Sequence, residues 1–258
     1  MKFYCNYLNK KTHHKIIYLE YTHNIAQKIK SFAPTELIMY DPVDFDVVDD
    51  FKKMSDVQNI ELKILETELF ITKTHQLQDY INKGGGFFQT SFYIWQRKIH
   101  NILLDQKGKP LGKKWTFDKE NRLPFPTSYI EENIFERKKY GDNEYVKEAI
   151  KYVNKHFSKN IGDLTDAPPF LPITHEDAKE YFGIFLKKKL DLFGPYEDAV
   201  SKDILFGNHS VLAPMMNIGL LTHQWVIDKI TEYYQKNPKL KLSSVEGIIR
   251  QIIGWANY

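Results

Sequence analysis

Apolar residues in the first 66 positions follow two alternating patterns. Residues 15–21, 36–40 and 60–65 are short apolar runs (KIIYLEY, ELIMY and IELKIL), and each predicts a β-strand. Residues 24–32 and 44–57 lie between these runs, with apolar positions spaced for one face of a helix. Strands that alternate with helices in this way predict a parallel sheet with the three strands side by side.

Residues 1–8 differ from this pattern, because they resemble the last turns of a helix rather than an opening strand. We therefore expect the remnant of a doubly wound parallel sheet that lacks its first strand. Such a sheet leaves an edge open to pairing with another chain.

From residue 70 onward the spacing of apolar residues is helical. We expect one helix that is capped by Thr72 or Thr74 and ends at residue 82, and further helices over residues 87–103, 142–157 and 225–235. Another helix starts at Thr174 as N-cap and buries one face, formed by Ala178, Tyr181, Phe182, Phe185, Leu186 and Leu190. Residues 84–86 (GGG) predict a hinge, and residues 104–126 and 162–172 predict loops.

The last helix is expected to start at Ser243 or Ser244, because Ser243 and Glu246 have the spacing of a capping box. Its buried stripe consists of Val245, Ile248, Ile249, Ile252 and Ile253. Arg250 is expected on the far side of this helix. Gln251 and Trp255 are separated by four residues, so both side chains are expected to face one cavity.

Composition excludes several classes of protein and favours none. The formal charge is only +3, from 36 basic and 33 acidic residues, which neither requires nor excludes nucleic acid as a partner. Cys5 is the only cysteine, so the chain has no disulfide framework and no cysteines for an iron–sulfur cluster. No apolar run approaches 18 residues, and the first residues lack the apolar core of a signal peptide. We expect a protein of a reducing intracellular compartment that does not enter a membrane.

Residues 193–222 contain the most unusual chemistry. Two turns with glycine are followed by Asn208, His209 and Ser210, which we expect to cap a helix through Val211, Leu212, Met215 and Ile218. A helix start beside a hydroxyl and an imidazole suits a phosphate group. The alternative is a capped core helix after a loop.

Three blocks in this region, FGPYEDAV (193–200), HSVLAPMMNIGLL (209–221) and VEGIIRQIIGW (245–255), resemble consecutive blocks of the photolyase/cryptochrome superfamily. They are most similar to its deoxyribodipyrimidine photolyase-related branch, the iron–sulfur bacterial cryptochromes and prokaryotic (6-4) photolyases. Residues 112–126 (GKKWTFDKENRLPFP) resemble another segment of that family, which we interpret as a packed interdomain strap without a catalytic role. The chain departs from the family at Gln89, Thr90 and Ser91, where a Met-Glu pair is usual, and at Ala256 and Asn257, where Arg-Glu is usual.

The resemblance implies an α/β remnant followed by the first part of an all-helical FAD-binding domain. The corresponding expected boundaries are a partial antenna-like domain at residues 1–85, connecting helices and loops at 86–172, and a truncated FAD-binding-like domain at 173–258. It implies FAD as cofactor, an antenna chromophore as a second one, and light-driven repair of UV-induced pyrimidine lesions in DNA. The implied FAD-binding residues are Tyr196, His209, Ser210 and Leu212, and the implied substrate-binding residues are Arg250 and Trp255. Each also has a simpler interpretation: core packing for Tyr196, Leu212 and Trp255, helix capping for His209 and Ser210, and a solvated charge for Arg250.

Family members are longer than this chain, so three hypotheses follow. The first is one piece of a split photolyase-like flavoprotein, inactive alone, which assembles with a complementing fragment or with itself and binds DNA only when assembled. The second is a degenerate remnant without enzymatic activity, retained as a binding module. The third is an independent α/β nucleotide-binding protein, which the absence of a phosphate-loop motif disfavours.

Overall fold

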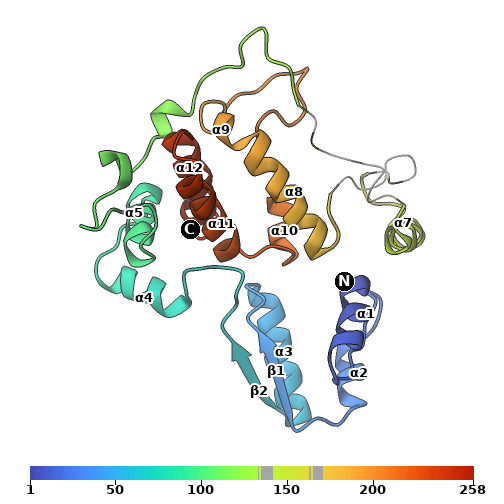
Figure 1. Ribbon diagram of the computed structural model, residues 1–258. Helices are drawn as coiled ribbons and strands as arrows, with labels where there is room; N and C mark the ends of the chain where they lie inside the picture. The colour runs from blue at the N-terminus through green and yellow to red at the C-terminus, as the bar shows by residue number, and fades with distance from the viewer. Residues whose placement is uncertain (133, 135–141, 163, 165–170) are drawn as a thin grey trace. The chain divides into compact units, whose positions relative to one another are not determined.

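The computed structural model describes residues 1–132, 134, 142–162, 164 and 171–258 (Figure 1). The chain divides into two compact units, Met1–Glu68 and Leu69–Tyr258. In the described residues it is mostly helical, with a small two-stranded parallel sheet near the N-terminus. The predicted domain boundaries after residues 85 and 172 stay predictions.

The first unit consists of three helices and two strands. In chain order they are α1 (Lys2–Lys11), α2 (Ile25–Lys30), β1 (Glu36–Tyr40), α3 (Phe45–Gln58) and β2 (Glu61–Leu65). Asn24 and Asp44 cap α2 and α3, because their side chains accept the N–H groups of Gln27 and Val47. Helix α3 connects the two strands, which pair in parallel with Glu36 opposite Glu61. The predicted helices, the last two strands and their parallel pairing are confirmed.

The predicted strand at residues 15–21 is wrong, since this segment has no regular secondary structure. Instead of a neighbouring strand, the side-chain amide of Asn9 binds the backbone of Ile16. Asn9 Nδ2 donates to the Ile16 carbonyl oxygen and the Ile16 N–H donates to Asn9 Oδ1, both at 3.2 Å. The sheet therefore has two strands in the described chain, not the expected three.

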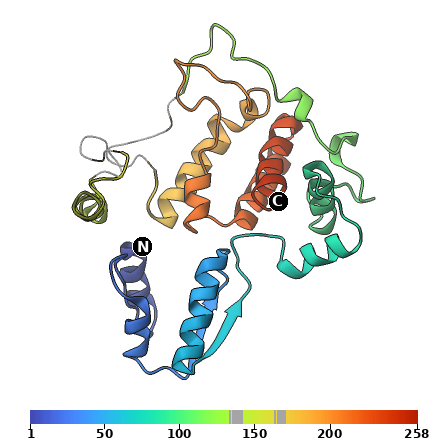
Figure 2. The same cartoon turned by 180° about the vertical axis from the view of Figure 1, so that it is seen from behind.

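The second unit is helical in its described residues. Its α-helices are α4 (Thr74–Asn82), α5 (Gln89–Ile99), α7 (Glu144–His156), α8 (His175–Lys188), α9 (Leu190–Phe193), α10 (Ala213–Asn217), α11 (His223–Lys236) and α12 (Leu242–Ile249). A π-helical segment, η3 (Arg250–Trp255), continues directly from α12. In both views α12 lies between α5 on one side and α8 and α9 on the other (Figures 1 and 2). No helix of the described chain is both long and apolar enough to cross a bilayer.

The core of this unit confirms the two predicted apolar faces. The expected face of α8 and all five residues of the stripe on α12 and η3 are buried in one cluster, together with Val226, Ile227 and Ile230 of α11. Thr174 caps α8 as expected, since its hydroxyl accepts the N–H of Asp177. Burial of apolar side chains at about 25 cal/mol per Å2 provides most of the stabilisation of such a cluster.

Two other predicted caps are wrong. Helix α4 is preceded by Lys73, and Thr72 instead donates its hydroxyl to the side chain of Gln96. Helix α12 is preceded by Lys241 without a side-chain cap. The hydroxyl of Ser244 accepts the Gly194 N–H at 2.9 Å and donates to the Asp191 carbonyl at 2.8 Å, which ties α12 to the turn after α9.

Residues 104–126 are loop apart from two short 3-10 turns, Leu111–Lys113 and Asp118–Glu120, as the sequence predicts, whereas α5 ends at Ile99 and not at residue 103. Arg97 of α5 anchors this loop, and this arginine is only 1% exposed. Its guanidinium donates to the carbonyl oxygens of Ile102, Leu103 and Trp115 and lies 5.3 Å from the Trp115 ring centre. The predicted loop at 162–172 falls largely on residues 163 and 165–170, outside the described residues.

Candidate functional site

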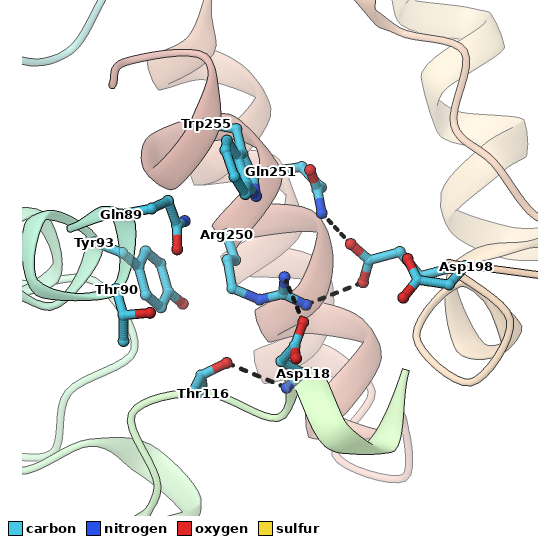
Figure 3. A pocket seen from close by; sticks show the side chains of 10 residues that line it. Gln89, Thr90, Tyr93, Thr116, Asp118, Asp198, Arg250, Gln251 and Trp255 are labelled. Atoms are coloured by element: carbon cyan, nitrogen blue, oxygen red, sulfur yellow. Dashed lines mark hydrogen bonds and ion pairs between the residues drawn. The ribbon is translucent and has the colours of Figure 1, made fainter. Parts of the chain in front are cut away.

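Three segments far apart in sequence surround a cavity of about 360 Å3 (Figure 3). They are the strap (residues 112–126), the turn after α9 (residues 194–198) and the helix formed by α12 and η3; α5 provides one more wall. The lining residues are Gln89, Thr90, Tyr93, Thr116, Asp118, Glu197, Asp198, Arg250, Gln251 and Trp255. Both Gln251 and Trp255 line this cavity, so the prediction that they face one cavity is confirmed.

Arg250 is the charged centre of the site. Its side chain is only 7% exposed, so the expected position on the far, solvated side of the helix is wrong. Its guanidinium lies 3.2 Å from Glu197, 3.4 Å from Glu246 and 3.5 Å from Asp118. Three carboxylates around one guanidinium compensate the cost of burying the charge.

Glu246 is buried in this network and does not cap α12. Its side chain is 1% exposed, and it accepts hydrogen bonds from the Tyr93 hydroxyl at 2.7 Å and the Phe117 N–H at 3.0 Å. Burial, together with the nearby charge of Glu246, raises the pKa of Tyr93 well above its ordinary value. Tyr93 therefore stays a neutral hydrogen-bond donor, and Glu246 links α5 and the strap to the helix.

Glu197 lies where the three segments meet. Its carboxylate accepts hydrogen bonds from Asn121 of the strap at 2.9 Å, from Arg250 at 3.2 Å, and from the amide of Gln251. Burial raises the pKa of the Glu197 carboxyl, although Arg250 and the Gln251 amide act in the opposite direction. Glu197 therefore contributes a carboxyl group to the cavity wall, and its ability to accept hydrogen bonds depends on pH.

The strap is packed as the sequence predicts. Asp118 and Arg122 form an ion pair. Asp118 also faces Arg250, so the strap provides part of the cavity wall in addition to its packing role. Gly247 allows this close approach, because a Cβ there would lie 2.8 Å from both the Asn121 amide nitrogen and a Glu197 oxygen.

The chemistry of the wall favours a neutral, planar ligand. Asp118, Glu197 and Asp198 give the cavity acidic groups around one buried, already paired arginine, so a phosphate would be repelled. Trp255 is 55% exposed and offers a ring face for stacking. The side chains of Gln89 and Gln251 offer amide groups that recognise hydrogen-bonding edges.

The four predicted FAD-binding residues lie along one stretch of the chain but in different environments. Tyr196 is half-buried and packs on Phe125 and Tyr129, with ring centres 5.4 and 6.1 Å away. Leu212 is 1% exposed in the core. His209 is exposed and its Nε2 lies 2.9 Å from the Glu197 carbonyl oxygen, while the Ser210 carbonyl accepts the Tyr181 hydroxyl at 2.8 Å. Their binding roles stay predictions.

The predicted helix cap in this stretch is wrong. Helix α10 spans only Ala213–Asn217, follows Leu212 and has no side-chain cap. Val211, just before it, has a left-handed backbone with φ of 50°, so the helix does not extend back to Ser210. A helix of five residues is too short to provide an anion site at its start.

A carboxylate of the chain itself occupies the backbone N–H groups of the loop before His209. Glu131 accepts the backbone N–H groups of Leu205, Phe206 and Gly207 at 2.8 to 2.9 Å. Burial alone raises the pKa of Glu131, but these three N–H groups and Lys189 outweigh it and lower that pKa. Lys189, 1% exposed, donates to the Gly207 carbonyl at 2.6 Å, and burial lowers its pKa.

Sequence reasoning missed Glu197, Glu246, Tyr93 and Asn121 as site residues. One signal was present, because Glu246 stands in an otherwise apolar run from Val245 to Ile249. A charged residue within a buried stripe requires a partner, and Arg250 lies one helical turn later. In the described residues, no group of three or more His, Cys, Asp or Glu side chains is arranged to hold a metal ion.

Comparison with known proteins shows the protein family to which the chain belongs. The model of the deoxyribodipyrimidine photo-lyase-related protein family matches residues 1–168, so the chain belongs to this family. A (6-4) photolyase of Agrobacterium fabrum is 26% identical over 238 residues, which cover 92% of this chain and 46% of that protein. Two uncharacterized proteins of Acanthamoeba polyphaga mimivirus also match, R852 (34% over 134 residues) and R853 (43% over 63 residues). The chain spans 46%, 67% and 48% of the lengths of these three relatives, in that order.

Proposed function

We propose that this chain is part of a photolyase-like flavoprotein and that its cavity receives a UV-damaged pyrimidine of DNA. The observation that carries the proposal is the cavity wall, which combines the exposed Trp255 ring, the Gln251 amide and acidic side chains. This wall suits a neutral base and repels a phosphate. A base inside a duplex is unreachable, so the damaged nucleotide has to be flipped out of the stack to enter the cavity.

Phosphate contacts then have to come from outside the cavity. Lys107, Lys109, Lys113, Lys114 and Lys119 are exposed on the strap and the loop before it. Ammonium groups of this kind bind phosphates as point charges and position DNA without reading its sequence. They support a contact between this loop and the DNA backbone, with strong dependence on salt.

The flavin, when bound, would supply the electron for repair in light, and the protein would supply position and electrostatics. The loop at residues 205–212 does not by itself fit a diphosphate. Its N–H groups at Leu205, Phe206 and Gly207 already donate to the Glu131 carboxylate. The Lys189 ammonium already donates to the Gly207 carbonyl oxygen. We therefore propose that Tyr196, His209 and Ser210 contact FAD only when another chain, or a second copy of this chain, contributes the remaining groups.

A second candidate is a binding module without enzymatic activity. Asn257, which replaces an acidic residue of the family pattern, has a packing role here. Its Oδ1 accepts the Ile71 N–H at 3.1 Å, and its Nδ2 donates to the Ile252 carbonyl at 2.8 Å. A position that serves packing favours this candidate, in which the cavity binds a base but no repair follows.

The test is an absorption spectrum of the purified chain after incubation with FAD and desalting, followed by DNA binding. Flavin bands that survive desalting, with tighter binding of irradiated than of intact oligothymidylate, support the flavoprotein. Selective binding of the irradiated oligonucleotide without flavin bands supports the binding module. Equal binding of irradiated and intact DNA contradicts both candidates.

A further inference from the structure

Gln251 lines the cavity with a side-chain amide that is fixed at one end. Its Nε2 donates to Glu197 Oε1, and no described residue donates to its Oε1. Figure 3 shows the amide nitrogen directed along this hydrogen bond and the oxygen on the opposite side of the amide. The group that Gln251 leaves for a ligand is therefore a carbonyl oxygen.

The carboxylate of Glu197 determines this orientation. An ionised carboxylate only accepts hydrogen bonds, so the amide has to present its NH2 group to it. The carboxylate is itself held, because its Oε2 accepts Asn121 Nδ2 at 2.9 Å and Arg250 Nη2 at 3.2 Å. With both oxygens of Glu197 engaged, a flip of the Gln251 amide would place two acceptors against each other.

The surroundings restrict what can pair with this oxygen. Trp255, four residues further along the same helix, offers an exposed ring face, so the ligand is expected to be planar. Asp118 and Asp198 line the same cavity, so an anionic ligand is disfavoured. A hydrogen-bond acceptor on the wall selects a ligand that carries a donor.

We propose that Glu197 is a positioning residue that makes Gln251 Oε1 an acceptor, and that the cavity thereby selects planar heterocycles with a lactam or imide N–H. The substrate class rests on the proposed function, since both a pyrimidine base and a flavin ring carry such a group. The orientation of the Gln251 amide does not rest on it. The two parts are tested separately.

The orientation is tested without ligand, by NMR of the side-chain amides in the full chain. The Gln251 NH2 signal is assigned by its loss in Gln251→Met. This signal is expected to shift with pH as Glu197 titrates, and to lose the shift in Glu197→Gln. The other charged groups that face Glu197 are Arg250, Glu246, Asp118 and Asp198, and they are present in both proteins. Gln224, whose amide donates to Asp228 at 2.8 Å on the surface, is the matched control and is expected to be unaffected by Glu197→Gln.

Selection is tested with two pairs of probes: oligothymidylate against its N3-methyl form, and riboflavin against its N3-methyl form. The unmethylated member of the pair that enters the cavity is expected to bind about tenfold more tightly, the value of one hydrogen bond. Both Glu197→Gln and Gln251→Met are expected to remove this preference while affinity for the methylated probe is kept. The preference of the wild type is expected to disappear as the pH falls and Glu197 becomes protonated.

A Gln251 signal that titrates in the wild type alone, with a preference lost in both variants, supports the proposal. A signal unchanged in Glu197→Gln, or a preference that survives in either folded variant, overturns it. If only riboflavin is selected, the cavity is a flavin site. Absence of binding by any probe, with the expected behaviour of the amide signal, contradicts the proposed function and supports the orientation.

Discussion

Arg250 Nη2 lies 3.2 Å from Glu197 Oε2, and the two side chains are only 7% and 8% exposed. This buried pair joins the helix of α12 and η3 to the turn after α9, and Asn121 adds the strap to it. A buried charge of this kind is costly to leave without its partner, whereas a surface pair contributes little. The site is therefore also a part of the structure on which the fold depends.

Replacement of Arg250 by Met is expected to lower the free energy of unfolding by about 3–5 kcal/mol, because Glu197 and Glu246 would remain buried without their cation. Urea denaturation of the purified variant measures this change. Arg122→Met is the matched control, since Arg122 pairs with Asp118 while 62% exposed, and it is expected to cost at most about 1 kcal/mol. Equal losses in the two variants would contradict the central role of Arg250.

The pH dependence of stability is expected to report on Glu197. Burial raises the pKa of this carboxyl above its ordinary value of 4.5, so the folded state holds the proton more tightly than the unfolded state. This contribution to stability is complete below the unfolded pKa and is lost as the pH rises through the folded pKa. Glu197→Gln carries no such proton, so the wild type is expected to lose stability relative to this variant as the pH rises from about 4 to 7. A difference that is constant or grows with pH would refute the assignment.

Glu131→Ala is expected to release the loop at residues 205–207, because the backbone N–H groups of these three residues would lose their acceptor. The expected cost is about 1–3 kcal/mol, with faster hydrogen exchange at the amides of Leu205, Phe206 and Gly207. Glu132→Ala is the control, since the Glu132 carboxylate pairs with Lys188 on the surface and is 53% exposed. Unchanged exchange at the three amides in Glu131→Ala would show that the carboxylate does not hold this loop.

Gly247→Ala is expected to push the strap away from α12. The new Cβ would lie 2.8 Å from both Asn121 and Glu197, which are held in the site, so a loss of about 1–3 kcal/mol is expected. Gly183→Ala, at a position in α8 where a Cβ meets no atom within 4 Å, is expected to gain about 0.5–1 kcal/mol from helix propensity alone. Thermal unfolding of both variants distinguishes close packing from propensity, and a gain in both would contradict the close approach.

The sequence by itself determined the local elements and the faces that they bury. The helical spacing on α8 and on α12 and η3 identified the core, and the Thr174 cap was predicted from short-range chemistry. These features are encoded within a few residues, because a helix repeats every 3.6 residues and a cap involves the next turn. Residues 15–21 show the limit of this reasoning, since an apolar run becomes a strand only where a partner strand satisfies its backbone.

Only the tertiary structure decided which charges are buried. Arg250 and Asp118 are 132 positions apart, and Glu197 and Gln251 are 54 apart, so no local pattern indicates that they meet. A charged side chain in a sequence is expected to be solvated unless a partner compensates its burial, and that partner comes from another segment. The cavity, its acidic wall and the orientation of Gln251 exist because the strap, the turn and the helix converge on one guanidinium.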